Sequence, residues 1–191
     1  MRNRLALLMM IMLSLLLITI KGASQTAINK WEAADSATIR LTLDSFPELP
    51  EAIKIYLTER GYTIPQVYGE VKPGNVIQGE FKQEGQTDWA VLSSKNFVST
   101  ILVFWNSETK KIDSLASRPD ISYLQNMGDS IGYSRYIGKV DAKYMLDHFI
   151  AYGSGDPPPL DHDGINDGFA RKGSSVHYYY KDFWYMLPGA D

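Results

Sequence analysis

The feature that most constrains the fold is the run Ile101–Trp105, five consecutive apolar residues bounded by polar segments. A short run of β-branched and aromatic residues between polar clusters is typical of a strand that is covered on both faces. A second apolar segment, Thr87–Leu92, precedes it and is joined to it by the short polar loop Ser93–Phe97. We therefore interpret residues 76–105 as the centre of a β-sheet, built around this hairpin.

The first 24 residues have the layout of a secretory signal peptide. Arg2 and Arg4 form a positive start, Leu5–Ile20 is an apolar stretch, and small residues follow at Gly22–Ser24. The apolar stretch is shorter than the roughly 20 residues that a membrane span needs, although an uncleaved N-terminal anchor is the alternative. We therefore expect an exported protein, either periplasmic or secreted.

The predicted cleavage site after residue 24 leads us to divide the chain into three parts. We predict a signal peptide over residues 1–24, a mobile lead-in over residues 25–37, and a single domain over residues 38–191. A remainder of this length suits one domain of ordinary size.

Charge and cysteine content exclude several classes of function. Cleavage after residue 24 removes Arg2, Arg4 and Lys21 from the 19 basic residues and nothing from the 22 acidic ones, so the net charge changes from −3 to −6. This charge argues against nucleic acid as a partner, because binding requires neutralised phosphates, and against a membrane surface once the signal is cleaved. The absence of cysteine excludes disulfides, lipid attachment to cysteine, thiol catalysis and thiolate zinc sites.

Two helices are predicted, over residues 50–60 and 141–152. Pro50 suits a first helical turn, and Gly61 suits the position just after a last turn. Asp141 is the expected N-cap of the second helix, which Gly153 ends. Apolar residues recur in both segments at helical spacing, at Leu49, Ile53, Tyr56 and Leu57 and at Ala142, Met145, Phe149 and Tyr152.

Additional strands are expected on both sides of the central hairpin. They fall at residues 38–43, 76–81, 112–117 and 131–140, and in an aromatic hairpin over 175–187 that turns near Lys181–Asp182. The predicted fold class is α+β, with a single, mainly antiparallel sheet of about five to seven strands and two covering helices.

Several segments together resemble a known family. They are GEF at 79–81, TDWAVL at 87–92, ILVFW at 101–105, IGYSR at 131–135, DHDGIND at 161–167, VHY at 176–178 and GAD at 189–191. Their succession resembles a family of small exported bacterial proteins that is uncharacterised. The resemblance implies an exported single domain and no particular activity.

The segment Gly79–Leu92 is also similar to one strand pair of an integrin-type propeller blade. Propeller blades are normally repeated several times in a chain. Here the segment occurs once and lacks a cluster of aspartates, so it predicts neither a propeller nor its calcium site.

The segment Asp161–Asp167 is a candidate metal-binding loop. Asp161 and Asp163 supply carboxylates, Gly164 permits a sharp turn, Ile165 offers a main-chain carbonyl, and Asp167 is a further ligand. This pattern is similar to the middle of a calcium loop, although the closing bidentate acid is missing. Calcium is therefore the candidate cofactor, and none is required. The alternative is a turn whose side chains bond their own backbone.

The same segment allows a hydrolytic metal site. Asp161, His162 and Asp163, together with His177, are residue types that hold catalytic metals. Spacing of the HExxH type is absent. The alternative is a surface His162 and a cross-strand His177.

The aromatic C-terminal hairpin is a candidate binding surface. Tyr179 and Trp184 are predicted on its solvent face, where they would stack on sugar rings or on a protein partner. The alternative is that both faces of the hairpin are covered, because strands are rich in aromatic residues for packing reasons alone.

Nothing in the sequence specifies a reaction. The glycine-rich phosphate loops are missing, and Ser134 in GYSRY lacks the second glycine of a nucleophile elbow. We expect an exported, non-enzymatic domain that binds an unidentified protein or an envelope polysaccharide. The alternatives are a metal-dependent hydrolase that uses Asp161–Asp167, and a domain with a structural calcium site there.

Overall fold

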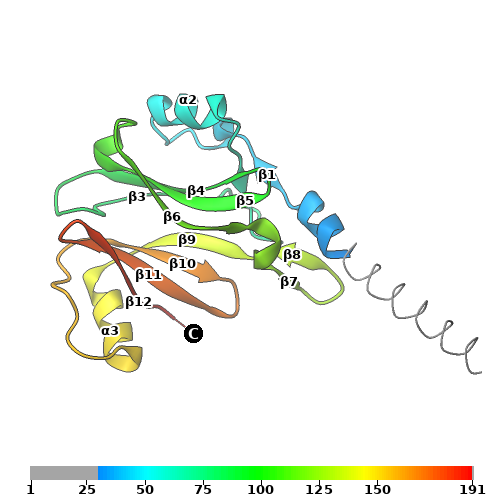
Figure 1. Ribbon diagram of the computed structural model, residues 1–191. Coiled ribbons are helices and arrows are strands. Elements are labelled where there is room, and N and C mark those ends of the chain that lie inside the picture. The colour runs from blue at the N-terminus through cyan, green and yellow to red at the C-terminus, as the bar shows by residue number, and fades with distance from the viewer. Residues whose placement is uncertain (1–29, 191) are drawn as a thin grey trace, which may run out of the picture.

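Two stacked four-stranded sheets form the centre of the computed structural model, which describes residues 30–190 (Figure 1). The first sheet has the order β3-β4-β5-β6 and the second the order β12-β11-β10-β9, and all neighbours within them are antiparallel. The strands of the first sheet are β3 (Val76–Gly79), β4 (Asp88–Lys95), β5 (Val98–Phe104) and β6 (Ile112–Pro119). Those of the second are β9 (Arg135–Val140), β10 (Gly164–Phe169), β11 (Gly173–Tyr180) and β12 (Phe183–Pro188).

Shorter elements connect and cover these sheets. Two small sheets pair β1 (Arg40–Leu41) with β2 (Ile64–Pro65) and β7 (Leu124–Asn126) with β8 (Ile131–Tyr133). The helices are α2 (Glu51–Glu59) and α3 (Ala142–Tyr152), and residues 30–37 are also helical. Short 3-10 turns are η1 (Leu43–Ser45), η2 (Trp105–Ser107) and η3 (Asp120–Tyr123).

The predicted α+β fold with a single sheet of about five to seven strands is wrong. The described chain is mostly β, and its strands divide among four separate sheets. The segment 131–140, expected as one strand, is split at Ser134 into β8 and β9, which belong to different sheets. Periodicity identifies a strand, but its sheet is chosen by the tertiary contacts of the whole domain.

The central hairpin is covered on both faces, as its sequence predicted. Trp89 and Val91 of β4 point into a core shared with α2, while Ala90 and Leu92 point into a core shared with the second sheet. β5 divides in the same way, because successive side chains of a strand lie on opposite faces. The hairpin therefore lies between a helix and a sheet.

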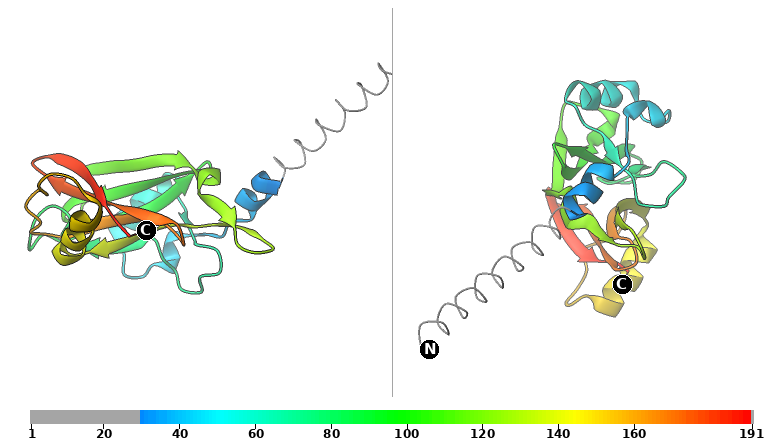
Figure 2. Two further views of the ribbon diagram at one scale, coloured as in Figure 1. Left: turned by 90° about the horizontal axis from the view of Figure 1, so that it is seen from below. Right: turned by 90° about the vertical axis from the view of Figure 1, so that its right-hand side faces the viewer.

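The second sheet is covered on its outer face by α3. Val176 and Tyr178 of β11 pack there with Met145 of α3 and Leu187 of β12. The molecule thus has four layers in the order α2, first sheet, second sheet, α3, and the right-hand view of Figure 2 shows the two helices on opposite sides of the stack.

Both predicted helices are confirmed. Pro50 is the N-cap residue of α2, and Gly61, with φ of 71°, follows its end. Asp141 caps α3 by accepting a hydrogen bond from the Tyr144 N–H at 2.8 Å. In the part of the chain between residues 30 and 190, no helix has the length and apolarity to cross a membrane. The predicted signal peptide and residues 25–29 of the predicted lead-in lie outside the described residues. The rest of the lead-in, residues 30–37, is helical.

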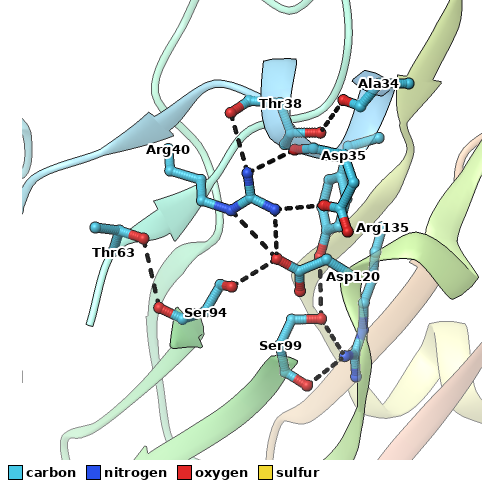
Figure 3. A network of polar contacts seen from close by, with 10 residues as sticks. Ala34, Asp35, Thr38, Arg40, Thr63, Ser94, Ser99, Asp120 and Arg135 are labelled. Atoms are coloured by element: carbon cyan, nitrogen blue, oxygen red, sulfur yellow. Dashed lines mark hydrogen bonds and ion pairs between the residues drawn. The ribbon is translucent and has the colours of Figure 1, made fainter. Parts of the chain in front are cut away.

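A buried ion-pair network attaches the N-terminal segment to the first sheet (Figure 3). The Arg40 guanidinium donates to Asp35 Oδ1 at 2.6 Å and to Asp120 Oδ2 at 2.7 Å. Ser94 Oγ on β4 donates to the same Asp120 oxygen at 2.6 Å. Since the Asp120 side chain is fully buried, its charge depends on Arg40 for compensation. The network fixes η3 at the end of the sheets.

We predict that Arg40→Met destabilises the fold by about 3–5 kcal/mol, because it leaves the buried Asp120 carboxylate without its partner. The measurement is urea unfolding at pH 7. Lys143→Met, which removes an exposed pair within α3, is the control and is expected to leave the urea midpoint unchanged. Equal midpoints for the two variants would contradict the dependence of Asp120 on Arg40.

Candidate functional site

The predicted metal loop is a strand for most of its length. β10 begins at Gly164 and is paired on both sides, with β9 and with β11. From Gly164 onward, the segment is therefore held by backbone hydrogen bonds to β9 and β11 and does not form the expected turn. The predicted ligands are consequently separated along an extended chain instead of being gathered around one point.

Each predicted ligand has a different environment. The Asp161 side chain is 72% exposed, whereas Ile165 is fully buried between the sheets. Asp163 Oδ2 accepts the Glu80 N–H at 3.0 Å, and Asp167 pairs with Arg135. Within residues 30–190, no three His, Cys, Asp or Glu side chains are grouped so that they could hold a metal ion.

The two histidines of the hypothetical hydrolytic site line different clefts. His162 stacks on Tyr178, with ring centroids 4.4 Å apart, and His177 lies beside Asp167. The constellation Asp161, His162, Asp163 and His177 is therefore not assembled.

The predicted aromatic pair is part of the core. Tyr179 is 6% exposed, with its ring centroid 4.9 Å from that of Trp105. Trp184 stacks on the same Trp105 at 5.5 Å, and its Nε1 donates to Asp113 Oδ2 at 3.0 Å. The rings of Tyr179 and Trp184 thus pack between the two sheets. The sequence had predicted them on the solvent face of the hairpin.

Nevertheless, Asp161 and Tyr179 contribute to one cleft at an end of the sandwich, where the β11–β12 turn lies on the left in Figure 1. Three segments meet there: the β3–β4 loop, the segment before β10, and the β11–β12 turn. The cleft has a volume of about 450 Å³. We call it the tyrosine cleft, and its lining residues are Lys82, Gln83, Glu84, Asp161, His162, Tyr179, Tyr180, Lys181 and Asp182.

The β3–β4 wall of the tyrosine cleft is held in place by Asp88, which is fully buried. Its carboxylate accepts the Lys82 N–H at 3.1 Å, the Gln86 side-chain amide at 2.7 Å and the Asn106 N–H at 2.7 Å. Because the loop hydrogen-bonds to one buried carboxylate, its backbone is fixed before any ligand arrives.

The second wall is attached to the first by Asp163 and Glu80. The Asp163 N–H donates to Glu80 O at 3.1 Å, and the Glu80 N–H donates to the Asp163 carboxylate. Lys139 Nζ lies 3.3 Å from that carboxylate. The aspartate that was predicted as a metal ligand therefore connects two loops.

One carboxylate of the tyrosine cleft is positioned by a tyrosine hydroxyl. Tyr179 Oη donates to Asp182 Oδ1 at 3.1 Å, whereas the hydroxyl proton of Tyr178 goes to Pro159 O at 2.7 Å, with Asp161 Oδ1 3.1 Å away. Burial raises the pKa of Tyr178 to about 12, and burial together with Asp182 raises the pKa of Tyr179. Both hydroxyls therefore keep their protons at neutral pH.

Arg135 of β9 and Asp167 of β10 form a second ion pair, within the second sheet and on its face toward the first sheet. Arg135 Nε donates to Asp167 Oδ1 at 2.9 Å and Nη2 donates to Oδ2 at 2.8 Å, while Nη1 lies 3.2 Å from Ser99 Oγ. Burial acts to raise the pKa of Asp167, but hydrogen bonds from His177 and Arg135 and the charge of Arg135 outweigh it and hold that pKa below its ordinary value.

The sequence contained weak signals for the residues that were missed. Lys82–Glu84 belong to the polar turn KQEGQ, which predicts a reversal but not a binding wall. Asp88 occurs within an apolar strand segment, and a charge in that position indicates a buried partner. The signal for Arg135 is similar, because it lies between Tyr133 and Ile137, which are both buried.

The comparisons with known proteins identify no relative. The chain matches no protein-family model, and no curated protein or solved structure matches it. The resemblance to small exported bacterial proteins therefore stays a prediction.

We predict that Asp167 makes stability depend on pH in acid. Its folded-state pKa is depressed below that of an unfolded aspartate, about 3.9. Its ionised form therefore stabilises the fold above about pH 4, and this contribution is lost as the pH falls through that value toward the folded-state pKa.

The measurement is the urea midpoint at pH 7 and at several values from about pH 5 to about pH 3. Asp167→Asn should be less stable than the original chain at pH 7 and should lose less stability on acidification. Asp129→Asn, at an exposed turn residue, is the control. Parallel pH curves for Asp167→Asn and the original chain would contradict this assignment.

Proposed function

We propose that this protein is an exported, non-enzymatic domain that binds a neutral envelope polysaccharide in the tyrosine cleft. The observation that carries the proposal is the combination, in one preformed cleft, of the carboxylates of Asp161 and Asp182 with an amide and tyrosine rings, the Asp182 carboxylate being positioned by the Tyr179 hydroxyl. Export is supported by the signal-like pattern of residues 1–24.

The hydrogen-bonding groups of the tyrosine cleft suit sugar hydroxyls. A hydroxyl both donates and accepts, so it pairs with a carboxylate, an amide or an ammonium group. Asp161 and Asp182 supply acceptors, Gln83 supplies both kinds of group, and Lys82 and Lys181 supply donors. Because Asp88 and Asp163 fix the loops, less conformational entropy is lost on binding.

Exposed aromatic surface continues from the tyrosine cleft onto β12. Phe183 is the register partner of Tyr180 and is 69% exposed. Tyr185, also exposed, has its ring centroid 6.2 Å from that of Tyr180. Such rings stack against the apolar face of a sugar, and they take over the role that the sequence assigned to Tyr179 and Trp184.

The charge of the cleft favours a neutral saccharide over an acidic one. Its lining has three carboxylates, of Glu84, Asp161 and Asp182, against two ammonium groups, of Lys82 and Lys181. A polyanion would meet a net negative site. Of the two partners expected from the sequence, the polysaccharide thus agrees better with the groups that line the cleft.

We predict that Asp182→Asn weakens saccharide binding about tenfold, the effect of losing a charge-assisted hydrogen bond. Asp182 has φ of 62°, a conformation that asparagine tolerates well, so the turn is expected to persist. The measurement is isothermal titration of the purified protein with tetrasaccharides of glucose, mannose, galactose and N-acetylglucosamine.

Two controls accompany this titration. Asp129→Asn removes an equal charge from an exposed turn outside the cleft, and Tyr152→Ala removes an aromatic ring that is 60% exposed on α3, also outside the cleft. Failure of every tetrasaccharide to bind, or unchanged binding in Asp182→Asn, would overturn the proposal.

A further inference from the structure

The space between the two sheets is apolar at one end and polar at the other. Ile137, Ile165 and Tyr179 of the second sheet belong to the inter-sheet core. Toward the other end of the same face, Arg135 follows Ile137 on β9 and Asp167 follows Ile165 on β10. On β11, His177 lies two residues before Tyr179 and therefore on the same face. The polar end thus reaches to within two residues of Tyr179, where the lining of the tyrosine cleft begins on this strand.

A cleft of about 310 Å³ opens at the polar end. We call it the arginine cleft. Its lining includes Arg118, Tyr123, Phe169, Ser175, His177 and Met186, together with Asp167. It is therefore formed by the end of β6, by η3, and by three strands of the second sheet.

The back of the arginine cleft is electrically compensated. Arg135 is fully buried and binds Asp167 through two hydrogen bonds, and its guanidinium lies 4.4 Å from the centroid of the Tyr123 ring. Arg135 also contacts Ser99 of β5, as Figure 3 shows. Because the charges of Arg135 and Asp167 neutralise each other, neither residue attracts a charged ligand strongly.

His177 presents an unused ring nitrogen. The residue is 9% exposed, and its Nε2 lies 3.4 Å from Asp167 Oδ2. An ionised carboxylate can only accept a hydrogen bond, so Nε2 carries the proton. Nδ1 is then the remaining polar atom, and it has no hydrogen-bond partner within residues 30–190. In this tautomer Nδ1 is a hydrogen-bond acceptor, so it can receive a hydrogen bond from a hydroxyl but cannot bind a carboxylate.

The charge at the mouth of the arginine cleft is positive. Arg118 is exposed and forms no ion pair with any residue between 30 and 190. Lys172 is not part of the lining, but its Nζ lies 4.5 Å from the ring centroid of Phe169, which is part of it. The acidic side chain in the lining is Asp167, which Arg135 compensates.

Apolar surface lies beside these cations. Met186 is 71% exposed, and Phe169 is half-buried. The cleft thus combines a free guanidinium, a buried imidazole and serine hydroxyls with a small apolar wall. Guanidinium groups match carboxylates through two parallel hydrogen bonds.

From this arrangement we infer that the arginine cleft binds a carboxylate group, held by Arg118 at the mouth and by the Ser175 hydroxyl within. The carboxylate belongs either to a small organic acid or to a uronic acid residue. This site uses other residues than the tyrosine cleft, so it stands whether or not that cleft binds a saccharide.

The test uses three probes and nuclear magnetic resonance. The purified protein is titrated with galacturonate, with galactose as its matched neutral sugar, and with succinate as a carboxylate without a sugar ring. Amide signals of residues 173–177 are expected to shift with a carboxylate probe and not with galactose. Raised salt is expected to weaken the binding, because Arg118 is exposed.

Variants locate the binding. Arg118→Gln is expected to reduce carboxylate affinity about tenfold, through the loss of charge-assisted hydrogen bonds. The change is at an exposed side chain, so the urea midpoint should be unchanged. Arg60→Gln removes an equal charge from the exposed end of α2 and should leave the affinity unaltered. Asp182→Asn, in the tyrosine cleft, should also leave it unaltered.

Each outcome bears on the inference. Binding of galacturonate and succinate supports a site for the carboxylate alone, and binding of one of them supports the inference and names the source. If neither shifts the amide signals of residues 173–177, if galactose binds equally well, or if Arg118→Gln has no effect, the inference is overturned.

Discussion

The requirement to cover both faces of the β4–β5 hairpin determines the rest of the architecture. A hairpin that is apolar on both faces is not stable at the surface of a domain, since each exposed Val, Leu, Ile or Phe forfeits about 1.5–3 kcal/mol of burial free energy. α2 covers one face and the second sheet covers the other. The second sheet then has an outer face of its own, and α3 covers it.

Buried charges, in contrast, position the loops. Asp88 fixes the β3–β4 loop, Asp120 fixes η3 against the first sheet, and Arg135 connects the second sheet to Ser99. Each of these residues is fully buried. A buried charge that loses its partner is destabilising by several kcal/mol, so each group strongly favours one arrangement of its loop. Both proposed clefts adjoin one of these groups.

The sequence predicted local structure better than it predicted assembly. The hairpin was readable because Ile101–Trp105 is apolar throughout, and the helices because Pro50, Gly61 and Asp141 are specific end signals. The division into two sheets was not readable. The interval Gly164–Phe169 contains Asn166 and Asp167, residues that favour turns, and it becomes a strand through pairing with β9 and β11.

The candidate sites were predictable only in part for the same reason. Asp161 was predicted as a metal ligand and Tyr179 as an exposed stacking residue, and both line the tyrosine cleft. Their surroundings depend on contacts with distant residues. Arg40 and Asp120 lie 80 positions apart, and Arg135 and Asp167 lie 32 apart. No spacing rule within a single sequence relates such partners, because their contact is created by the stacking of the sheets.

The strand β11 extends from one cleft to the other, and this geometry has a consequence for ligand occupancy. The β11 residues of the arginine cleft end at His177 and those of the tyrosine cleft begin at Tyr179, which is about 7 Å further along the strand. β11 is hydrogen-bonded to a neighbour on each side, and it therefore behaves as a stiff rod. A ligand in either proposed cleft would therefore rest against the same strand, whose pairing on both sides sets the spacing between the two linings.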